Sequence, residues 1–303
     1  MAIERIRILG VASGGGAGKP GAQDGPTKLR ELGLITRLQT AGFEVSDLGD
    51  VPGGHETEYD GEGEASRNVP EVLQVNRHTY AAVRNAWRDA TAKDFVLIIG
   101  GDHSLAIGTL GGITDSCKRL GILWIDAHAD FNTPYSSPSG NIHGMSLAIA
   151  CGRGHRELRA IAEYDPMVED QDVFLFGCRD IDPGEKENLT DSDVHLFEMP
   201  QWRAAGVVSS VVDAARLLAT RCDHVHLSFD IDVVDAEHVP GTGTRVAGGL
   251  SVDEACGLLR ELGGLRVLKS AEVVEYNPHI DAADKRTGKL TCDLIAALME
   301  GMR

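Results

Sequence analysis

The chain has 303 residues, 42% of them hydrophobic, and its 46 acidic and 29 basic side chains give a net charge of −17. This charge argues against a nucleic-acid partner, whose phosphates need a positive surface, and it suits a soluble protein with a cationic substrate. No stretch approaches 18 apolar residues, so we expect neither a membrane span nor a membrane partner.

The N-terminal sequence MAIERIRILG lacks a long apolar segment followed by a small-residue cleavage site, so we do not expect a signal peptide. Six cysteines are scattered along the chain without a C-x-x-C pair. Both features indicate a reduced, cytoplasmic setting in which the thiols mostly pack as small hydrophobic groups.

Apolar segments of strand length recur along the chain, and several of the longer segments between them have helical periodicity. We expect strands at 6–12, 43–49, 94–101, 121–127, 172–177, 224–232 and 267–275. We expect helices at 25–42, 69–90, 206–221 and 251–262, the last opening with a capping box of Ser251 and Glu254. The acidic, glycine-rich stretch 52–70 is expected to be a loop.

Strands that alternate with helices are typical of a parallel sheet covered by helices on both faces. The fold class is therefore α/β. No internal repeat or low-complexity linker divides the chain, and we expect one domain over residues 1–303.

Metal-type ligands follow three of the expected strands, at the edge where the carboxyl ends of parallel strands meet. They are His103 in GGDHS, Asp126, His128 and Asp130 in DAHAD, and Asp230 and Asp232 in SFDID. If strand geometry continues through DAHAD, its three ligands share one face. Two carboxylates and an imidazole placed so closely repel and lose hydration unless a cation lies between them.

Six such ligands, four of them carboxylates, exceed the three protein ligands of a catalytic zinc. They suit two ions about 3.5 to 4 Å apart that share bridging carboxylates. Ligands rich in oxygen favour a harder ion such as manganese over zinc. The residues therefore predict a binuclear site, whose ions would lower the pKa of a shared water and create hydroxide at neutral pH.

In order and spacing, GGDHS, DAHAD and SFDID resemble the three metal motifs of the ureohydrolase family of arginases and agmatinases. The resemblance covers nearly the whole chain, from GPTKLRELGL to NPHIDAADKRTGK. It is closest to bacterial arginase, because NTP, SGNIHGM and RDIDPGE resemble the arginase segments that hold the amino-acid end of the substrate.

This resemblance implies a three-layer α/β/α fold with a mostly parallel central sheet, two Mn²⁺ per chain, and a homo-oligomer, either a trimer or a hexamer. It implies a hydrolase of arginine metabolism that cleaves the guanidinium group of L-arginine to L-ornithine and urea by attack of a metal-bridging hydroxide. Two alternatives stay open. One is a sibling ureohydrolase acting on agmatine, 4-guanidinobutyrate or N-hydroxyarginine, and the other is a metal-stabilised sensor that binds arginine without hydrolysing it.

The resemblance also implies the residues that bind the ions. The first ion would be bound by His103, Asp126, Asp130 and Asp230. The second would be bound by Asp126, His128, Asp230 and Asp232, so that Asp126 and Asp230 bridge.

By the same resemblance, Asp130 would hold the hydroxide and pass its proton to the leaving amine. His143 would shuttle protons, and Glu275 would pair with the guanidinium. The groups implied for the amino-acid end are Asn132, Ser137 and Asn141 for the α-carboxylate, Asp182 for the α-ammonium, and Thr244 in the pocket wall.

The chain departs from the arginase pattern at Val233, Val234, Ala236, Arg245 and Tyr276. We expect the first four to lie in loops at the rim, where they bear on substrate preference, and Tyr276 to alter the packing behind the pocket. Asp180 and Glu185 either support the ligands or fix the loop that carries them.

Overall fold

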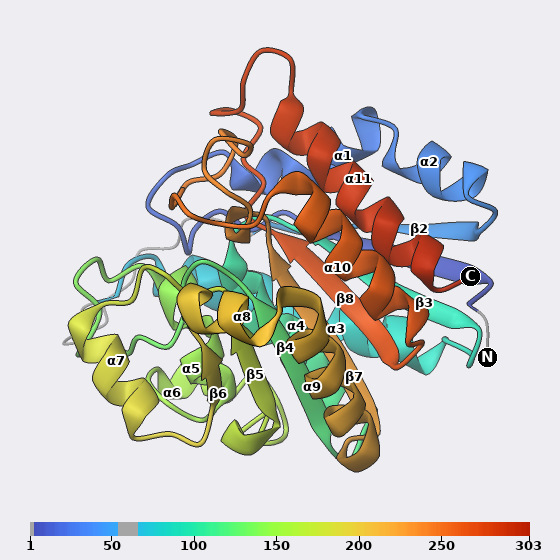
Figure 1. The fold of residues 1–303 in the computed structure, drawn as a ribbon. Coiled ribbons are helices and arrows are strands. Elements are labelled where there is room, and N and C mark those ends of the chain that lie inside the picture. The colour runs from blue at the N-terminus through green and yellow to red at the C-terminus, as the bar shows by residue number, and fades with distance from the viewer. Residues whose placement is uncertain (1–2, 54–65) are drawn as a thin grey trace.

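The fold is built on one eight-stranded sheet in the computed structural model, which describes residues 3–53 and 66–303 (Figure 1). Its strands are β1 Arg5–Val11, β2 Glu44–Val51, β3 Asp94–Gly100, β4 Leu120–Ile125, β5 Val173–Phe176, β6 His195–Phe197, β7 His224–Asp230 and β8 Leu268–Val274. The strand order is β2-β1-β3-β8-β7-β4-β5-β6, and each neighbouring pair is parallel. Most of the loop expected at 52–70 lies outside the described residues.

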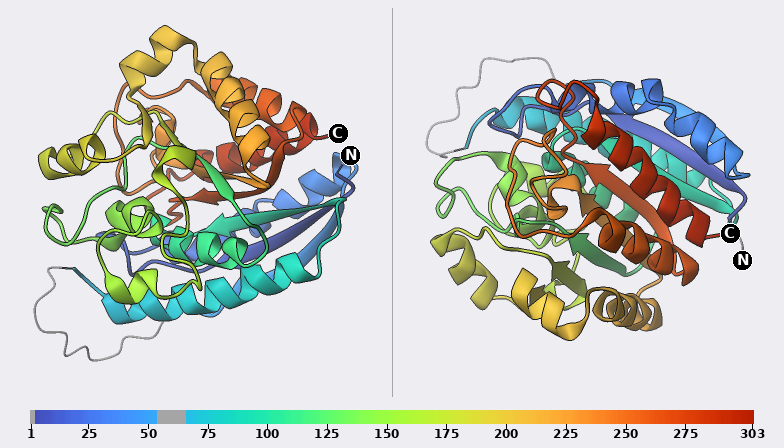
Figure 2. Two further views of the ribbon diagram at one scale, coloured as in Figure 1. Left: turned by 90° about the horizontal axis from the view of Figure 1, so that it is seen from below. Right: turned by 45° about the horizontal axis from the view of Figure 1, so that its top comes forward.

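Helices cover both faces of this sheet, as the two views of Figure 2 show. One face carries α1 Gly25–Glu31, α2 Leu34–Thr40, α8 Met199–Ala205, α9 Val207–Arg221, α10 Val252–Gly264 and α11 Arg286–Gly301. The other face carries α3 Val69–Arg88, α4 Ala106–Thr114, α5 Ser146–Ala150 and α6 Arg156–Arg159. A further helix, α7 Pro183–Thr190, follows β5. None of the helices in the described ranges combines the length and apolarity that a membrane span needs.

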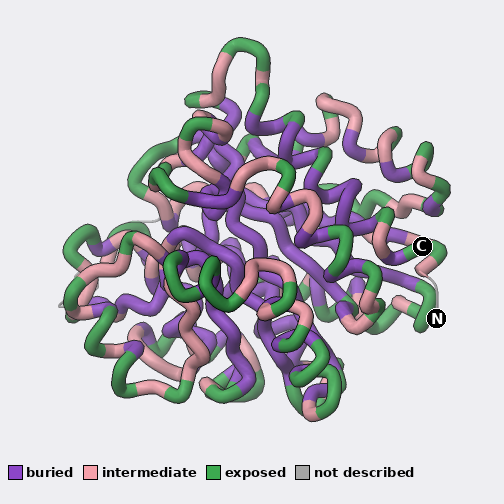
Figure 3. The backbone as a smooth tube through the Cα atoms, viewed as in Figure 1, coloured by how far each residue is buried: buried purple, intermediate pink, exposed green. Residues whose placement is uncertain are grey.

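The hydrophobic core is divided between the two faces of the sheet. Every residue of β3 is buried, and alternate side chains join opposite clusters. Phe95, Leu97 and Ile99 pack under α1, α2 and α11, whereas Val96 and Ile98 pack against α3 and α4. Figure 3 shows the same pattern, with buried strands between partly exposed helices. The expected three-layer α/β/α fold with a parallel central sheet is confirmed.

Several elements differ from the expectation, and the helices α4 to α8 and α11 were not among those expected. The single helix expected at 25–42 is two helices, α1 and α2, because Gly33 adopts a left-handed backbone with φ of 88° between them. The strand β6 was not expected, since a segment of three residues is too short for hydrophobic alternation to be recognised. The capping box at Ser251 and Glu254 is confirmed at the start of α10.

The turn after β3 places the start of the first metal motif tightly against β1. Gly101 donates a backbone hydrogen bond to Val11, and Asp102 donates one to Ser13. A Cβ added to Gly101 would lie 1.8 Å from the carbonyl oxygen of Ser13, so no larger residue fits unless the backbone moves.

We therefore expect Gly101→Ala to lower the free energy of unfolding by about 3 kcal/mol, the upper end for overpacking. Gly33→Ala is the matched control, because Gly33 has open space around the added Cβ and costs only the left-handed backbone, about 1 kcal/mol. Urea unfolding of both variants measures the difference. A larger loss for Gly33→Ala than for Gly101→Ala would contradict this packing argument.

Candidate metal centre and substrate pocket

The candidate metal ligands lie at or just beyond the carboxyl ends of β3, β4 and β7. His103 begins a short 3₁₀ helix, His103–Leu105, after the turn that follows β3. Asp102 holds this turn, since its carboxylate accepts hydrogen bonds from the backbone of Ser104 and Gly16. Asp230 is the last residue of β7, and its carboxylate accepts a hydrogen bond from the backbone of Asp232.

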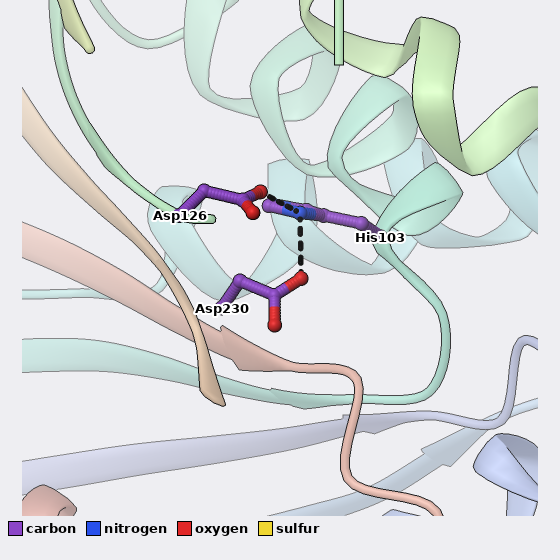
Figure 4. A group of neighbouring side chains, drawn as sticks. All are labelled: His103, Asp126 and Asp230. Atoms are coloured by element: carbon purple, nitrogen blue, oxygen red, sulfur yellow. Dashed lines mark ion pairs between the residues drawn. The ribbon is translucent and has the colours of Figure 1, made fainter. Parts of the chain in front are cut away.

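His103 faces three carboxylates at once. Its Nδ1 atom lies 3.1 Å from Asp126, 3.0 Å from Asp130 and 3.3 Å from Asp230. The ring is 1% exposed and stacks on Trp124 with 4.1 Å between ring centroids. Figure 4 shows Asp126 and Asp230 pointing at the same edge of the imidazole from different segments of the chain.

A second group of ligands adjoins the first and shares Asp126 with it. His128 Nδ1 lies 3.4 Å from Asp126 and 3.0 Å from Asp232. Asp126 is oriented by Trp124 Nε1 on one oxygen and by the backbone of His128 on the other. Thr244 donates a hydrogen bond of 2.9 Å to Asp232, which ties the distant loop of Thr244 to this group.

The expected strand geometry through DAHAD is wrong, although its three ligands do converge. Strand β4 ends at Ile125, and Asp130 has a left-handed backbone with φ of 50°. Glu275, just after β8, has φ of 66°. Such conformations are costly for residues other than glycine, and they persist where the surrounding structure holds them. A turn rather than continued alternation therefore aims Asp130 at His103.

The charges of this cluster fit bound cations. His103 Nδ1 is buried without a hydrogen-bond partner among the described residues. Burial acts to lower the pKa of His103, yet the surrounding carboxylates outweigh it and raise the pKa well above its ordinary value. Burial and the charge of Asp126 raise the pKa of Asp130 to about 6. The cluster thus attracts positive charge, and the two groups that share Asp126 can each hold one divalent ion.

His143 and Glu275 form a buried pair beside the first group. His143 Nδ1 lies 2.9 Å from Glu275 Oε1, which also accepts a hydrogen bond of 2.8 Å from the backbone of His103. Burial acts to lower the pKa of His143, but the Glu275 carboxylate outweighs it and raises the pKa to about 9. The two residues expected to act separately therefore contact each other.

A cavity of about 280 Å³ opens over the two groups. The expected site residues in its wall are His103, His128, Asp130, Asn132, Ser137, Asn141, His143, Asp182, Asp230 and Thr244. The other three, Asp126, Asp232 and Glu275, are buried at its base. Ser139 and Asp180 also line the cavity and were not assigned to the substrate pocket from the sequence.

Hydrogen bonds hold the polar wall of the cavity together. The amide of Asn132 donates to Asp182 at 3.0 Å and accepts from Ser136 at 2.9 Å. Ser136 was missed by sequence reasoning, because a serine in a loop has no pattern that separates it from ordinary turn chemistry. Ser137 stabilises the same loop by accepting from the backbone of Gly140.

The structure separates the roles of Asp180 and Glu185. Glu185 fixes a loop, since its buried carboxylate accepts hydrogen bonds from the backbone of Phe131 and of Asp182. Burial raises the pKa of Glu185 to about 8. Asp180 has a side chain that is 71% exposed, with one oxygen 4.0 Å from His128 Nε2 at the mouth of the cavity.

The departures from the arginase pattern fall in two environments. Val233 and Val234 are fully buried in the hydrophobic cluster under α10, so the expectation that they lie at the rim is wrong. Arg245 is exposed beside Thr244. Tyr276 is 1% exposed and packs against Gly288, where an added Cβ would lie 2.4 Å from its hydroxyl. Tyr276 thus packs against the start of α11, and its effect on the pocket stays a prediction.

Comparison with known proteins agrees with this geometry. Residues 4–300 match the Arginase family. The chain is 38% identical over 298 residues to an arginase of Bacillus caldovelox, covering 98% of this chain and 97% of that protein. It is 37% identical over 294 residues to an arginase of Bacillus subtilis strain 168, covering 97% of each.

Solved structures give the same result. The native structure of Bacillus caldovelox arginase superposes with a TM-score of 0.90 at 36% identity and covers 98% of both chains. An Entamoeba histolytica arginase in complex with L-ornithine superposes with a TM-score of 0.88 at 33% identity, covering 98% of this chain and 99% of that one. The chain therefore belongs to the Arginase family and is a metal-dependent amidinohydrolase.

Proposed function

We propose that this protein is an arginase, which hydrolyses L-arginine to L-ornithine and urea with two Mn²⁺ per chain. The observation that carries the proposal is the pair of ligand groups joined at Asp126, at the base of a cavity with a polar wall. A cationic guanidinium suits the carboxylates at the base, and an amino acid suits the amide, hydroxyl and carboxylate groups of the wall.

The residues proposed to hold the ions divide between the two groups. His103, Asp126, Asp130 and Asp230 would hold the first ion, and Asp126, His128, Asp230 and Asp232 the second. Asp126 belongs to both groups in the structure, which supports its bridging role. Bound together, the two ions would supply hydroxide at neutral pH by lowering the pKa of a water.

The acid–base roles follow from where protons can reside. Asp130 lines the cavity beside His103, so we assign it the role of accepting and donating a proton. His143 lines the cavity with its ring and is held through Nδ1, which leaves Nε2 to exchange protons with the pocket. Oxygen Oε1 of Glu275 already accepts two hydrogen bonds, so Oε2 is the oxygen that we assign to the guanidinium.

The amino-acid end of the substrate would bind at the cavity wall. We assign the α-carboxylate to Asn132, Ser137 and Asn141, and the α-ammonium to Asp182. The Entamoeba arginase complex with L-ornithine supports a ligand with these two charges, since that protein has nearly the same fold as this chain. A sibling substrate without the α-carboxylate would leave part of this wall without a partner.

Three further expectations are carried as part of the proposal. The chain forms one domain over residues 1–303, assembles into a homo-oligomer of three or six chains, and acts in the cytoplasm. An arginine sensor without hydrolysis is the non-enzymatic alternative, and release of urea by the manganese-loaded protein excludes it.

Substrate choice tests the proposed function. Arginine and agmatine differ by one carboxylate, and the specificity constant for arginine should exceed that for agmatine by roughly 10² to 10³, about 3 to 4 kcal/mol. This is less than a fully buried polar site achieves, because water can replace the carboxylate at the open wall. Urea release from arginine, agmatine and 4-guanidinobutyrate by one manganese-loaded preparation gives the comparison.

The variant Asp182→Ala locates the recognition of the amino-acid end. This variant should lower the specificity constant for arginine, because it lacks the carboxylate assigned to the α-ammonium. It should change the specificity constant for 4-guanidinobutyrate far less. A wild-type specificity constant for agmatine or 4-guanidinobutyrate within tenfold of that for arginine would contradict the arginase assignment. The protein would then be a sibling ureohydrolase.

Metal content tests the two groups. Asp126→Ala should weaken the binding of both ions, because Asp126 belongs to both groups. Asp232→Ala should instead lead to the loss of mainly one ion per chain. Asp180→Ala is the control, since Asp180 is near His128 but exposed and outside both groups. Manganese per chain after gel filtration is the measurement. A wild-type protein that saturates at one ion would refute the binuclear proposal.

The protonation of His143 tests whether it pairs with Glu275. In metal-free protein, NMR titration should give His143 a pKa of about 9, and Glu275→Gln should lower it. A raised pKa means that protonated His143 stabilises the fold below its ordinary pKa of about 6.5, and that this stabilisation is lost as pH rises through about 9. The Tm difference between wild type and Glu275→Gln should therefore shrink between pH 7 and pH 10.

A functional control accompanies this titration. His143→Asn should lower turnover by roughly 10²-fold or more while both ions remain bound. Unchanged turnover would remove His143 from the mechanism, and an unshifted pKa in Glu275→Gln would remove Glu275 as the cause.

A further inference from the structure

A row of buried polar side chains continues from His103 down one face of β7 and β8. Its members below His103 are Ser228, Glu272, His226, Ser270 and His224, each 2% exposed or less. The interior of a parallel sheet covered by helices is usually apolar, and buried polar groups cost free energy unless they are paired. The mechanism proposed above uses none of these five residues.

The row follows from strand register. His226 and Ser228 lie at alternate positions of β7 with the ligand Asp230, so all three point to the same face. On β8, Ser270 pairs with His226 and Glu272 pairs with Ser228. The sheet therefore places Glu272 beside the residue that contacts His103.

Counting hydrogens fixes the direction of the contacts. Ser228 Oγ lies 2.8 Å from Glu272 Oε1 and 2.7 Å from His103 Nε2. A hydroxyl has one hydrogen, and an ionised carboxylate can only accept, so Ser228 donates to Glu272. Ser228 must then accept from His103, which places a hydrogen on Nε2 and leaves Nδ1 as the nitrogen with a lone pair to offer the cation.

An uncharged Glu272 could reverse the direction of these two hydrogen bonds. A protonated carboxyl could donate to Ser228, and Ser228 could then donate to His103 Nε2. The hydrogen of the neutral imidazole would in that case lie on Nδ1, pointing at the carboxylates of Asp126, Asp130 and Asp230, where a metal ligand needs its lone pair. The charge of Glu272 therefore selects the tautomer of His103 that can bind an ion.

His226 helps to keep Glu272 ionised from the other side. Its Nε2 lies 3.7 Å from Glu272 Oε1, and its Nδ1 lies 2.7 Å from Ser270, which also contacts His224 at 2.8 Å. Burial acts to raise the pKa of Glu272, but the contacts with His226 outweigh it and leave the pKa below its ordinary value. Ser228 and His226 both approach Oε1 of this fully buried carboxylate, whereas Oε2 has no hydrogen-bond partner among the described residues.

We propose that Glu272 is a positioning residue which, through Ser228, holds His103 in its metal-binding tautomer and raises the affinity of the first ion. The inference rests on the proposed two-ion site. Neither Glu272 nor Ser228 contacts the ion or the substrate in this scheme, so their effect is expected on metal affinity before any effect on chemistry. Partners that orient a ligating histidine commonly change metal affinity by about 10- to 100-fold.

The test is a titration of metal-free protein with Mn²⁺, in which free manganese is followed by electron paramagnetic resonance. Glu272→Gln keeps the shape and removes the charge, and Ser228→Ala removes the linking hydroxyl. Each variant should lower the affinity for the ion of the His103 group by about 10-fold or more. Titrations in the Asp232→Ala background, which impairs the second group, identify which ion is affected.

The double variant and a neighbouring control separate this role from packing. Glu272→Gln with Ser228→Ala should lose no more affinity than either alone, because Glu272 acts through Ser228. Ser270→Ala, which lies in the same row but contacts neither Ser228 nor His103, should stay within about threefold of wild type. Unchanged affinity in Glu272→Gln, additive losses in the double variant, or an equal loss in Ser270→Ala would each overturn the inference.

Two outcomes keep the inference distinct from the proposed function. If the wild type binds one ion instead of two, the binuclear proposal fails, and the effect of Glu272→Gln on that ion decides the inference. If Glu272→Gln does not fold, Ser228→Ala carries the test alone, because it removes a single oxygen from the row.

Discussion

The constraint on which the rest of this structure depends is the crowding of buried carboxylates around the imidazole of His103. Three of them lie within 3.3 Å of one nitrogen, on an imidazole that stacks against Trp124. Such an arrangement is unfavourable without positive charge at its centre. The fold tolerates it because backbone hydrogen bonds at strand ends and short turns hold Asp126 and Asp230, and because a cation converts the repulsion into binding.

The parallel sheet delivers these groups to one place. The central order β3-β8-β7-β4 brings together four chain segments far apart in sequence, and each ends at the same edge. Close packing then fixes the turns, as at Gly101, where the backbone of Ser13 leaves no room for a side chain. The rigid core below the site explains how residues with left-handed backbones, Asp130 and Glu275, are held in position.

The wall of the cavity differs in character from its base. The base is buried and highly charged, whereas the wall is built from loops whose polar groups bond to one another, as Asn132 does to Asp182 and Ser136. This division is the reason for proposing a substrate with a guanidinium at one end and an amino acid at the other. The buried row under His103 extends the charged base into the sheet, so that the metal site is supported by residues of the core as well as by loops.

Local patterns were enough to predict seven of the eight strands, the α/β class, and the metal-ligand motifs, because apolar periodicity and ligand spacing are properties of neighbouring residues. The ligands of DAHAD were found for a partly wrong reason, since the turn after Ile125 and not strand alternation brings Asp130 to His103. Contacts such as His143 with Glu275, Ser136 with Asn132, and Glu272 with Ser228 were not foreseen. Residue types and spacing therefore determined which groups could carry the chemistry. Only the tertiary structure decided which distant groups touch, because the fold brings Ser228 to Glu272 across 44 positions and His143 to Glu275 across 132 positions.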